Sequence, residues 1–174
     1  IELPLIQRFQ LYLIHPAYSF AIVLFTLLIF SGLGSNFSKQ LRLPGVLIAL
    51  SVWWLLVSFF IKPLFQTSLN YPLALRAIFM TVIVAPGGFL MGCAFPAGLS
   101  FWSTKDEIQN RLPLIWAING AASVIASVAA MLLALTWGFN LVLRFGALGY
   151  GLAFLMVWWK EKLDGLLHHG AAQK

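Results

Sequence analysis

SFAIVLFTLLIF, residues 19–30, decides the class of fold, because it contains no charged side chain and does not alternate between apolar and polar residues. The uncharged run extends from Ala17 to Gly34. Such a length approaches the roughly 20 residues that a helix needs to cross a bilayer. The stretch therefore predicts a membrane-spanning helix, and its lack of alternation argues against a β-barrel strand.

The composition extends this interpretation to the whole chain. Hydrophobic residues make up 61% of the 174 residues and charged residues only 9%, whereas about a quarter of an ordinary soluble domain is charged. A soluble fold could not cover its surface with so few polar side chains. The formal net charge of +6 comes from basic residues that separate the apolar blocks. We therefore expect lipid headgroups of the bilayer, and not nucleic acid, as their partners.

The apolar blocks predict an all-α fold, a polytopic transmembrane helix bundle of about five spans. The bundle covers residues 17–159, with spans near 17–34, 46–61, 74–99, 114–137 and 141–159. Residues 1–16 read as an interfacial segment before the bundle, and residues 160–174 as a solvated tail. Lys62-Pro63 should end the second span, and the polar segment 103–113 should form a loop.

The basic residues also predict an orientation. The loops on the side of the tail, together with the tail, carry seven of them and the opposite side carries four, so the positive-inside rule places the tail in the cytoplasm. The chain begins at Ile1 without a signal-peptide pattern, which we interpret as a piece of a longer protein.

The third apolar block differs from the others in its helix breakers. It contains Pro86, Gly87, Gly88 and Gly92, followed by Pro96. This pattern predicts a kinked or broken span whose freed backbone groups face other helices, because lipid cannot satisfy them. Half-helix ends can also bind ions, so possible substrate contact at these residues is the alternative to helix packing.

WAINGAAS, residues 116–123, opens the fourth span with an amide and small residues. Asn119, Ser123 and Ser127 recur every four residues, beside Gly120, and so share one helix face. Small residues let helix backbones approach closely, and Asn or Ser can bond across the contact. We expect a helix-packing surface here, with possible substrate contact as the alternative.

Residues that carry chemistry are sparse. No Asp or Glu lies inside any of the five predicted spans, which argues against a proton-coupled transporter built from this piece alone. The three histidines and the carboxylates show no spacing typical of a metal site or a catalytic relay. We therefore predict no catalytic residue, no metal and no cofactor, and we expect Cys93 to be a buried thiol.

Three segments carry a resemblance to a known family: HPAYSFAIVLFTLLIFSGLGS, PGGFLMGCAFPAGLSFW and WAINGAASVIASVAAMLLALTWGFNLVLRFGALGY. Together, from about His15 to Tyr150, they resemble the membrane-embedded region of bacterial spermidine-synthase-like proteins, in which transmembrane helices are fused to an aminopropyltransferase- or methyltransferase-like domain. The resemblance implies a bacterial inner membrane and a soluble domain elsewhere in a longer protein. It carries no catalytic residue over to this chain.

Two hypotheses for function follow. In the first, the chain is an integral membrane module that anchors or assembles with such a synthase-like domain and with further helices, and has no chemistry of its own. In the second, it is part of a transport pathway for a small polar or cationic metabolite. Whether the full-length protein is an enzyme depends on the domain that the resemblance implies.

Overall fold

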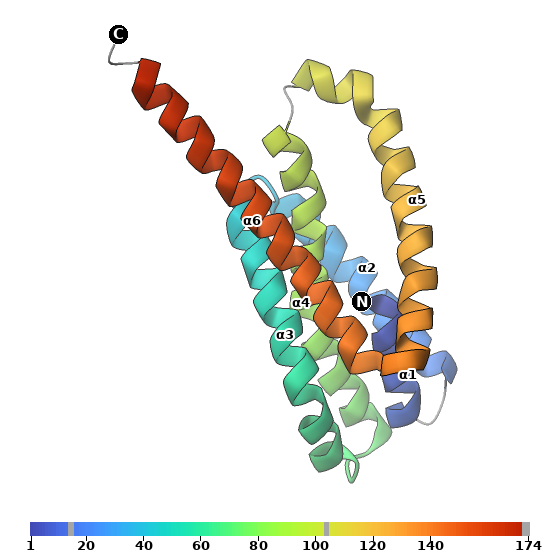
Figure 1. The fold of residues 1–174 in the computed structure, drawn as a ribbon. Helices are drawn as coiled ribbons and strands as arrows, with labels where there is room; N and C mark the ends of the chain where they lie inside the picture. The colour runs from blue at the N-terminus through green and yellow to red at the C-terminus, as the bar shows by residue number, and fades with distance from the viewer. Residues whose placement is uncertain (14–15, 103–104, 172–174) are drawn as a thin grey trace.

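The computed structural model describes residues 1–13, 16–102 and 105–171, in which all regular structure is helical. Figure 1 shows the helices in chain order: α1 (Glu2–Leu13), α2 (Pro16–Phe37), α3 (Leu43–Ser68), α4 (Leu73–Trp102), α5 (Lys105–Trp137) and α6 (Phe139–Ala171). Five of these, α2 to α6, are long and apolar enough to cross a membrane. The predicted all-α fold with five spans is confirmed, and the chain is an integral membrane protein.

The prediction that Lys62-Pro63 ends the second span is wrong, because α3 passes through both residues to Ser68. Proline removes one backbone donor from a helix, but packing on both sides of this point holds the helix together. Ile61 before it and Ser68 after it are buried. The hydroxyl of Thr67 also donates to the carbonyl of Pro63, at 3.3 Å.

The other helices also differ from the predicted segments. α4 is one continuous helix with Pro86 and Pro96 inside it. The predicted alternatives were a kinked or a broken span, and the span is not broken. The segment expected as a loop belongs to α5 from Lys105 onward, and α6 continues to Ala171 through most of the expected tail. Both segments contain Lys, Glu and Leu, which are good helix formers, so polarity alone did not end the helices.

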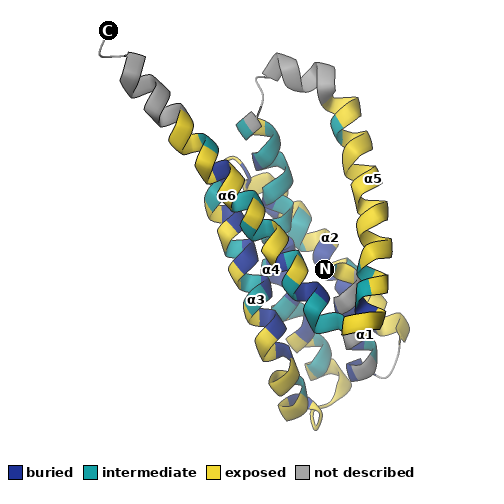
Figure 2. Ribbon diagram, viewed as in Figure 1, coloured by how far each residue is buried: buried dark blue, intermediate teal, exposed yellow. Residues whose placement is uncertain are grey.

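The core lies between α1, α2, α3, α4 and α6. Its buried residues include Leu5 and Phe9 of α1 and the fully buried Trp54 of α3, whereas α5 adds none to this cluster. The first segment is thus a helix, and its apolar side packs inside the bundle. Figure 2 shows the contrast with α5, whose described residues are exposed over almost the whole length of the helix.

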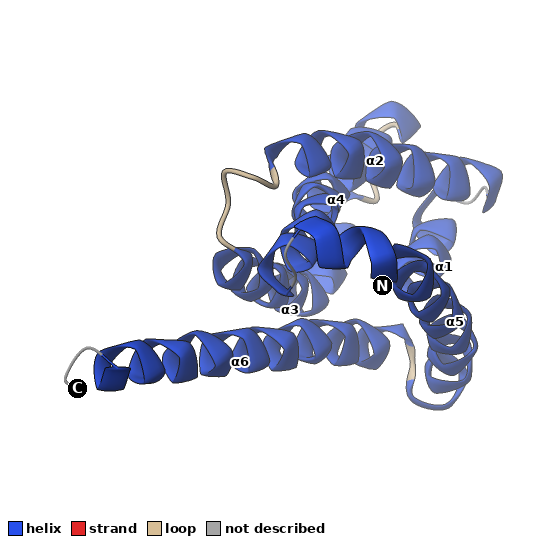
Figure 3. Ribbon diagram, turned by 90° about the horizontal axis from the view of Figure 1, so that it is seen from above, coloured by secondary structure: helices blue, strands red, loops and turns tan. Residues whose placement is uncertain are grey.

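Seen from above, α5 stands at the edge of the molecule, beyond the beginning of α6 (Figure 3). It contacts α6 and α1. The rings of Trp116 on α5 and Phe95 on α4 also meet, with centroids 5.4 Å apart. A single residue, Gly138, separates α5 from α6 and has a φ of 83°, in the left-handed region that favours glycine.

Arg76, near the beginning of α4, links several segments at one end of the bundle by hydrogen bonds. Its guanidinium donates to the carbonyls of Tyr71 at 2.9 Å, Tyr12 at 3.1 Å and Leu69. The hydroxyl of Tyr12 donates in turn to that of Ser68. These bonds join the ends of α1 and α3 to α4, and they satisfy carbonyls that a helix end leaves without a partner.

Candidate functional site

Helices α2 and α4 approach each other closely at a set that we call the glycine crossing: Ser31 and Gly34 on α2, and Gly88 and Gly92 on α4. A Cβ added at Gly92 would lie 2.5 Å from the Cα of Ser31, and one at Gly34 would lie 2.9 Å from the carbonyl carbon of Phe89. At Gly88 it would lie 3.3 Å from a methyl group of Leu27. Only glycine allows backbones to come this close.

Gly87 faces α3, another helix of the core. A Cβ at Gly87 would overlap the indole of Trp54 on α3 and would lie 2.9 Å from its Cη2 atom. Pro86 has no N–H, so a carbonyl one turn before it loses its helical partner. The indole N–H of Trp53 donates to the carbonyl beside it, that of Ile83, at 3.2 Å. Gly87, Gly88 and Gly92 therefore lie against other helices, α2 and α3.

Cys93 adds a polar contact to the glycine crossing. It is fully buried, as expected, and its thiol donates to the carbonyl of Gly34 at 3.0 Å. Neighbouring aromatic rings, those of Phe37 and Phe89, meet with centroids 5.9 Å apart. The crossing is thus packed by backbone atoms, a thiol and aromatic rings.

The second predicted surface has a different environment. Asn119, Gly120, Ser123 and Ser127, which we call the α5 polar face, are all exposed, and a Cβ at Gly120 would meet no atom within 4 Å. The hydroxyl of Ser127 donates to the carbonyl of Ser123 in the same helix, at 2.8 Å. No other helix of the described chain covers this face, so its predicted role in packing or substrate contact stays a prediction.

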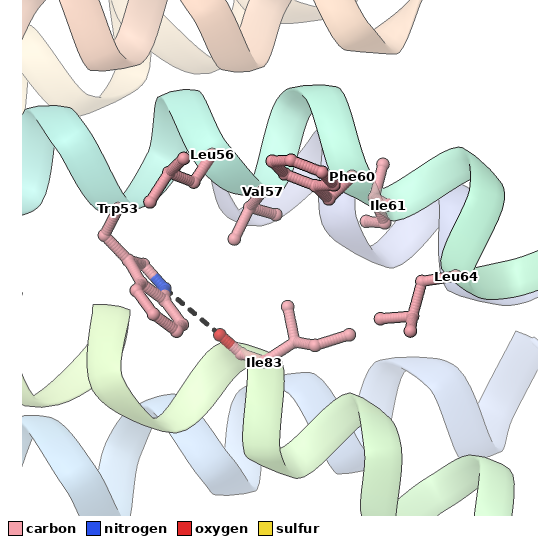
Figure 4. A pocket seen from close by; sticks show the side chains of 7 residues that line it. All are labelled: Trp53, Leu56, Val57, Phe60, Ile61, Leu64 and Ile83. Carbon is pink, nitrogen blue, oxygen red and sulfur yellow. Dashed lines mark hydrogen bonds between the residues drawn. The ribbon is translucent and has the colours of Figure 1, made fainter.

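An open apolar groove of about 160 Å³ lies between α3 and α4 (Figure 4). Its lining consists of large apolar side chains: Trp53, Leu56, Val57, Phe60, Ile61, Leu64 and Ile83. The one lining group with a polar hydrogen, the Trp53 indole, is already bonded to Ile83. The groove therefore offers an apolar surface and no group that would bind a polar metabolite.

Arg76 and Arg144 are two of the four basic residues predicted on the side opposite the tail, and the sequence did not indicate their roles in the fold. Both lie inside spans. The guanidinium of Arg144 on α6 lies over the ring of Phe59 on α3, 4.4 Å from its centroid. Its Nε is buried without a hydrogen-bond partner, as is the amide oxygen of Asn140 one turn earlier. A single charge within an apolar run was the signal that could have identified both.

Within the described residues, no group of three or more His, Cys, Asp or Glu side chains could hold a metal ion. His15 lies outside the described residues. Neither a protein-family model, nor a curated protein, nor a solved structure matches this chain.

Proposed function

We propose that the chain is a membrane module that assembles with further helices through the α5 polar face and anchors a spermidine-synthase-like domain in a bacterial inner membrane. The observation that carries this proposal is the exposure of Asn119, Gly120, Ser123 and Ser127 on a helix that crosses the membrane. An amide exposed to hydrocarbon lacks the hydrogen bonds that it has in water, which costs free energy. A neighbouring helix would supply them.

The glycine crossing supports this interpretation by example. Within the same chain, small residues on α2 and α4 lie where two helices meet, and the thiol of Cys93 bonds across that contact. The α5 polar face has the same combination of small residues and short polar side chains, but no helix of the described chain against it. The synthase-like partner is proposed from the resemblance of the sequence. This resemblance implies a fused domain and a membrane location, and it assigns no catalytic residue to this chain.

The alternative, a transport pathway, receives less support from the contacts. A polar or cationic metabolite needs a path lined with acceptors, whereas the groove between α3 and α4 is apolar throughout. Two buried polar atoms on α6 lack hydrogen-bond partners, the amide oxygen of Asn140 and the Nε of Arg144. The positive charge of Arg144 would repel a cation. We therefore retain the module as the proposed function and treat transport as an outcome of the tests.

Cysteine cross-linking in native membranes tests the proposal. In a Cys93→Ala background, a short bifunctional reagent should join Asn119→Cys to a further membrane helix, whether that helix belongs to a longer chain or to a separate synthase-like polypeptide. Ile125→Cys is the matched control, since it is also exposed but lies on the opposite side of α5. Equal cross-linking from both positions, or labelling of Asn119→Cys by a lipid-soluble probe alone, would contradict a docking face.

A further inference from the structure

Two arginines, Arg76 and Arg144, lie near the same end of the bundle, and they differ in their hydrogen-bond partners. Arg76 is close to the beginning of α4, and Arg144 lies about 7.5 Å along α6 from its beginning, at about 1.5 Å per residue. Three backbone carbonyls accept hydrogen bonds from the guanidinium of Arg76. The guanidinium of Arg144 has no acceptor among the described residues, and its Nε is buried.

Phe59 holds the guanidinium of Arg144 in a defined position. The guanidinium carbon lies over the ring, 4.4 Å from its centroid, so the two groups stack, and Phe59 is 59% exposed. A stacked guanidinium keeps its edge free, and this edge carries the two terminal nitrogens. The charge is therefore presented at the outer surface between α3 and α6.

No carboxylate whose side chain the structure describes forms an ion pair with Arg144. The acids with described side chains are Glu2 and Glu161, and neither forms an ion pair with Arg144. Glu161 is about 25 Å farther along α6, at about 1.5 Å per residue. Because a charge without a counterion is costly within a bilayer, an anion from outside the described residues would stabilise Arg144.

The surroundings indicate where this anion comes from. The exposed side chains beside Arg144 are large and apolar, namely Phe59, Phe145 and Leu148. Helix interfaces in membranes favour small residues, so this surface suits lipid better than another helix. Arg144 is also near enough to the end of its helix for its side chain to reach the headgroup region.

We propose that Arg144, stacked on Phe59 at the α3–α6 surface, binds the phosphate group of an anionic phospholipid. The planar guanidinium offers two parallel N–H groups to two phosphate oxygens. A lipid with net negative charge matches the uncompensated arginine. A zwitterionic lipid brings an ammonium group as well, for which the described residues around Arg144 supply no carboxylate.

The test uses the purified 174-residue chain in detergent, with phosphatidylglycerol as the probe, phosphatidylcholine as the zwitterionic comparison and inorganic phosphate alone as the third ligand. Native mass spectrometry measures the lipid retained, and thermal unfolding measures stabilisation. We expect phosphatidylglycerol to bind about tenfold more tightly than phosphatidylcholine, which corresponds to about 1.4 kcal/mol. Arg144→Gln should abolish this preference, and Arg42→Gln, an exposed arginine just before α3, should keep it.

A second variant guards against loss of the fold in Arg144→Gln. Phe59→Leu keeps the charge and removes the stack, so it should weaken binding of phosphatidylglycerol about threefold. Unchanged lipid binding in both variants would overturn the proposal. Equal stabilisation of the wild-type chain by inorganic phosphate would assign the site to free phosphate and overturn the lipid source, and a cross-link from position 144 to a carboxylate of another helix would do so as well.

Discussion

The glycine crossing and the α5 polar face are built from similar residues and have opposite environments. At Gly34 and Gly92 of the crossing, the nearest atoms to an added Cβ are backbone atoms of another helix, whereas at Gly120 no atom lies within 4 Å. The crossing therefore stabilises the chain by itself. The α5 polar face can add stability only when a partner helix packs against it. Small residues in a membrane helix therefore indicate a helix contact, but they do not identify the chain that supplies the other helix.

The largest effect that would test this comparison is expected at Gly92. Gly92→Ala places a methyl group against the backbone of Ser31, which cannot move without separating α2 from α4. We expect a loss of roughly 3 kcal/mol in the free energy of unfolding, the upper part of the range for overpacked cores. Unfolding in mixed detergent micelles measures it.

Gly98→Ala is the matched control, on the same helix with no atom within 4 Å of an added Cβ. It should be neutral or stabilise by up to about 1 kcal/mol, because alanine favours helix over glycine. If the two alanine variants lost equal stability, the glycine crossing would have no special role.

An intermediate effect is expected at Gly87, where the neighbour is a side chain and not backbone. Gly87→Ala pushes against the indole of Trp54, which can shift, so we expect a loss of about 1–2 kcal/mol. Adding Trp54→Phe should recover part of it, with a coupling energy of about 1 kcal/mol in a double-mutant cycle. Strict additivity of the two changes would show that this contact does not limit the packing.

The smallest effect on the isolated chain is expected at Gly120. Gly120→Leu fills open space, so its free energy of unfolding should change by less than about 0.5 kcal/mol or increase slightly. The same substitution should reduce assembly with a partner helix more than Asn119→Leu does, because close contact contributes more there than one hydrogen bond.

Two measurements separate the possible results at Gly120. Cross-linking yield in membranes reports assembly, and unfolding of the purified chain reports its own stability. If Asn119→Leu abolished a transport activity while both measurements stayed normal, the α5 polar face would be a substrate site and the proposed docking role would be wrong.

The five spans could be predicted because the signal is local: an uncharged apolar run such as 17–34 is long enough by itself to cross a bilayer. The ends of the helices could not, since Lys105 and Lys160 stand where the apolar runs stop, and lysine favours helix continuation as well as an interface. Pro63 was misread for a related reason, because packing of Ile61 and Ser68 outweighs its missing donor.

The site was less predictable than the fold, because contacts between helices depend on residues far apart in the sequence. The small residues of α4 were recognised, but their partners Ser31 and Gly34 were not, and nothing in WAINGAAS distinguishes a face covered by its own chain from an open one. The difference in hydrogen bonding between Arg76 and Arg144 could not be predicted for the same reason. Carbonyls from two other segments meet Arg76, and only the fold brings them there.

The turn at Gly138 has a consequence for how the protein enters the membrane during synthesis. Its N–H donates to the carbonyl of Ala134 at 2.9 Å, and its own carbonyl accepts from the N–H of Leu141 at 3.2 Å. The connection thus satisfies its own peptide groups and contains no long hydrophilic loop that would have to be translocated separately. α5 and α6 can therefore insert together as one helical hairpin, which would bring the uncovered α5 into the bilayer already paired with the helix that joins it to the core.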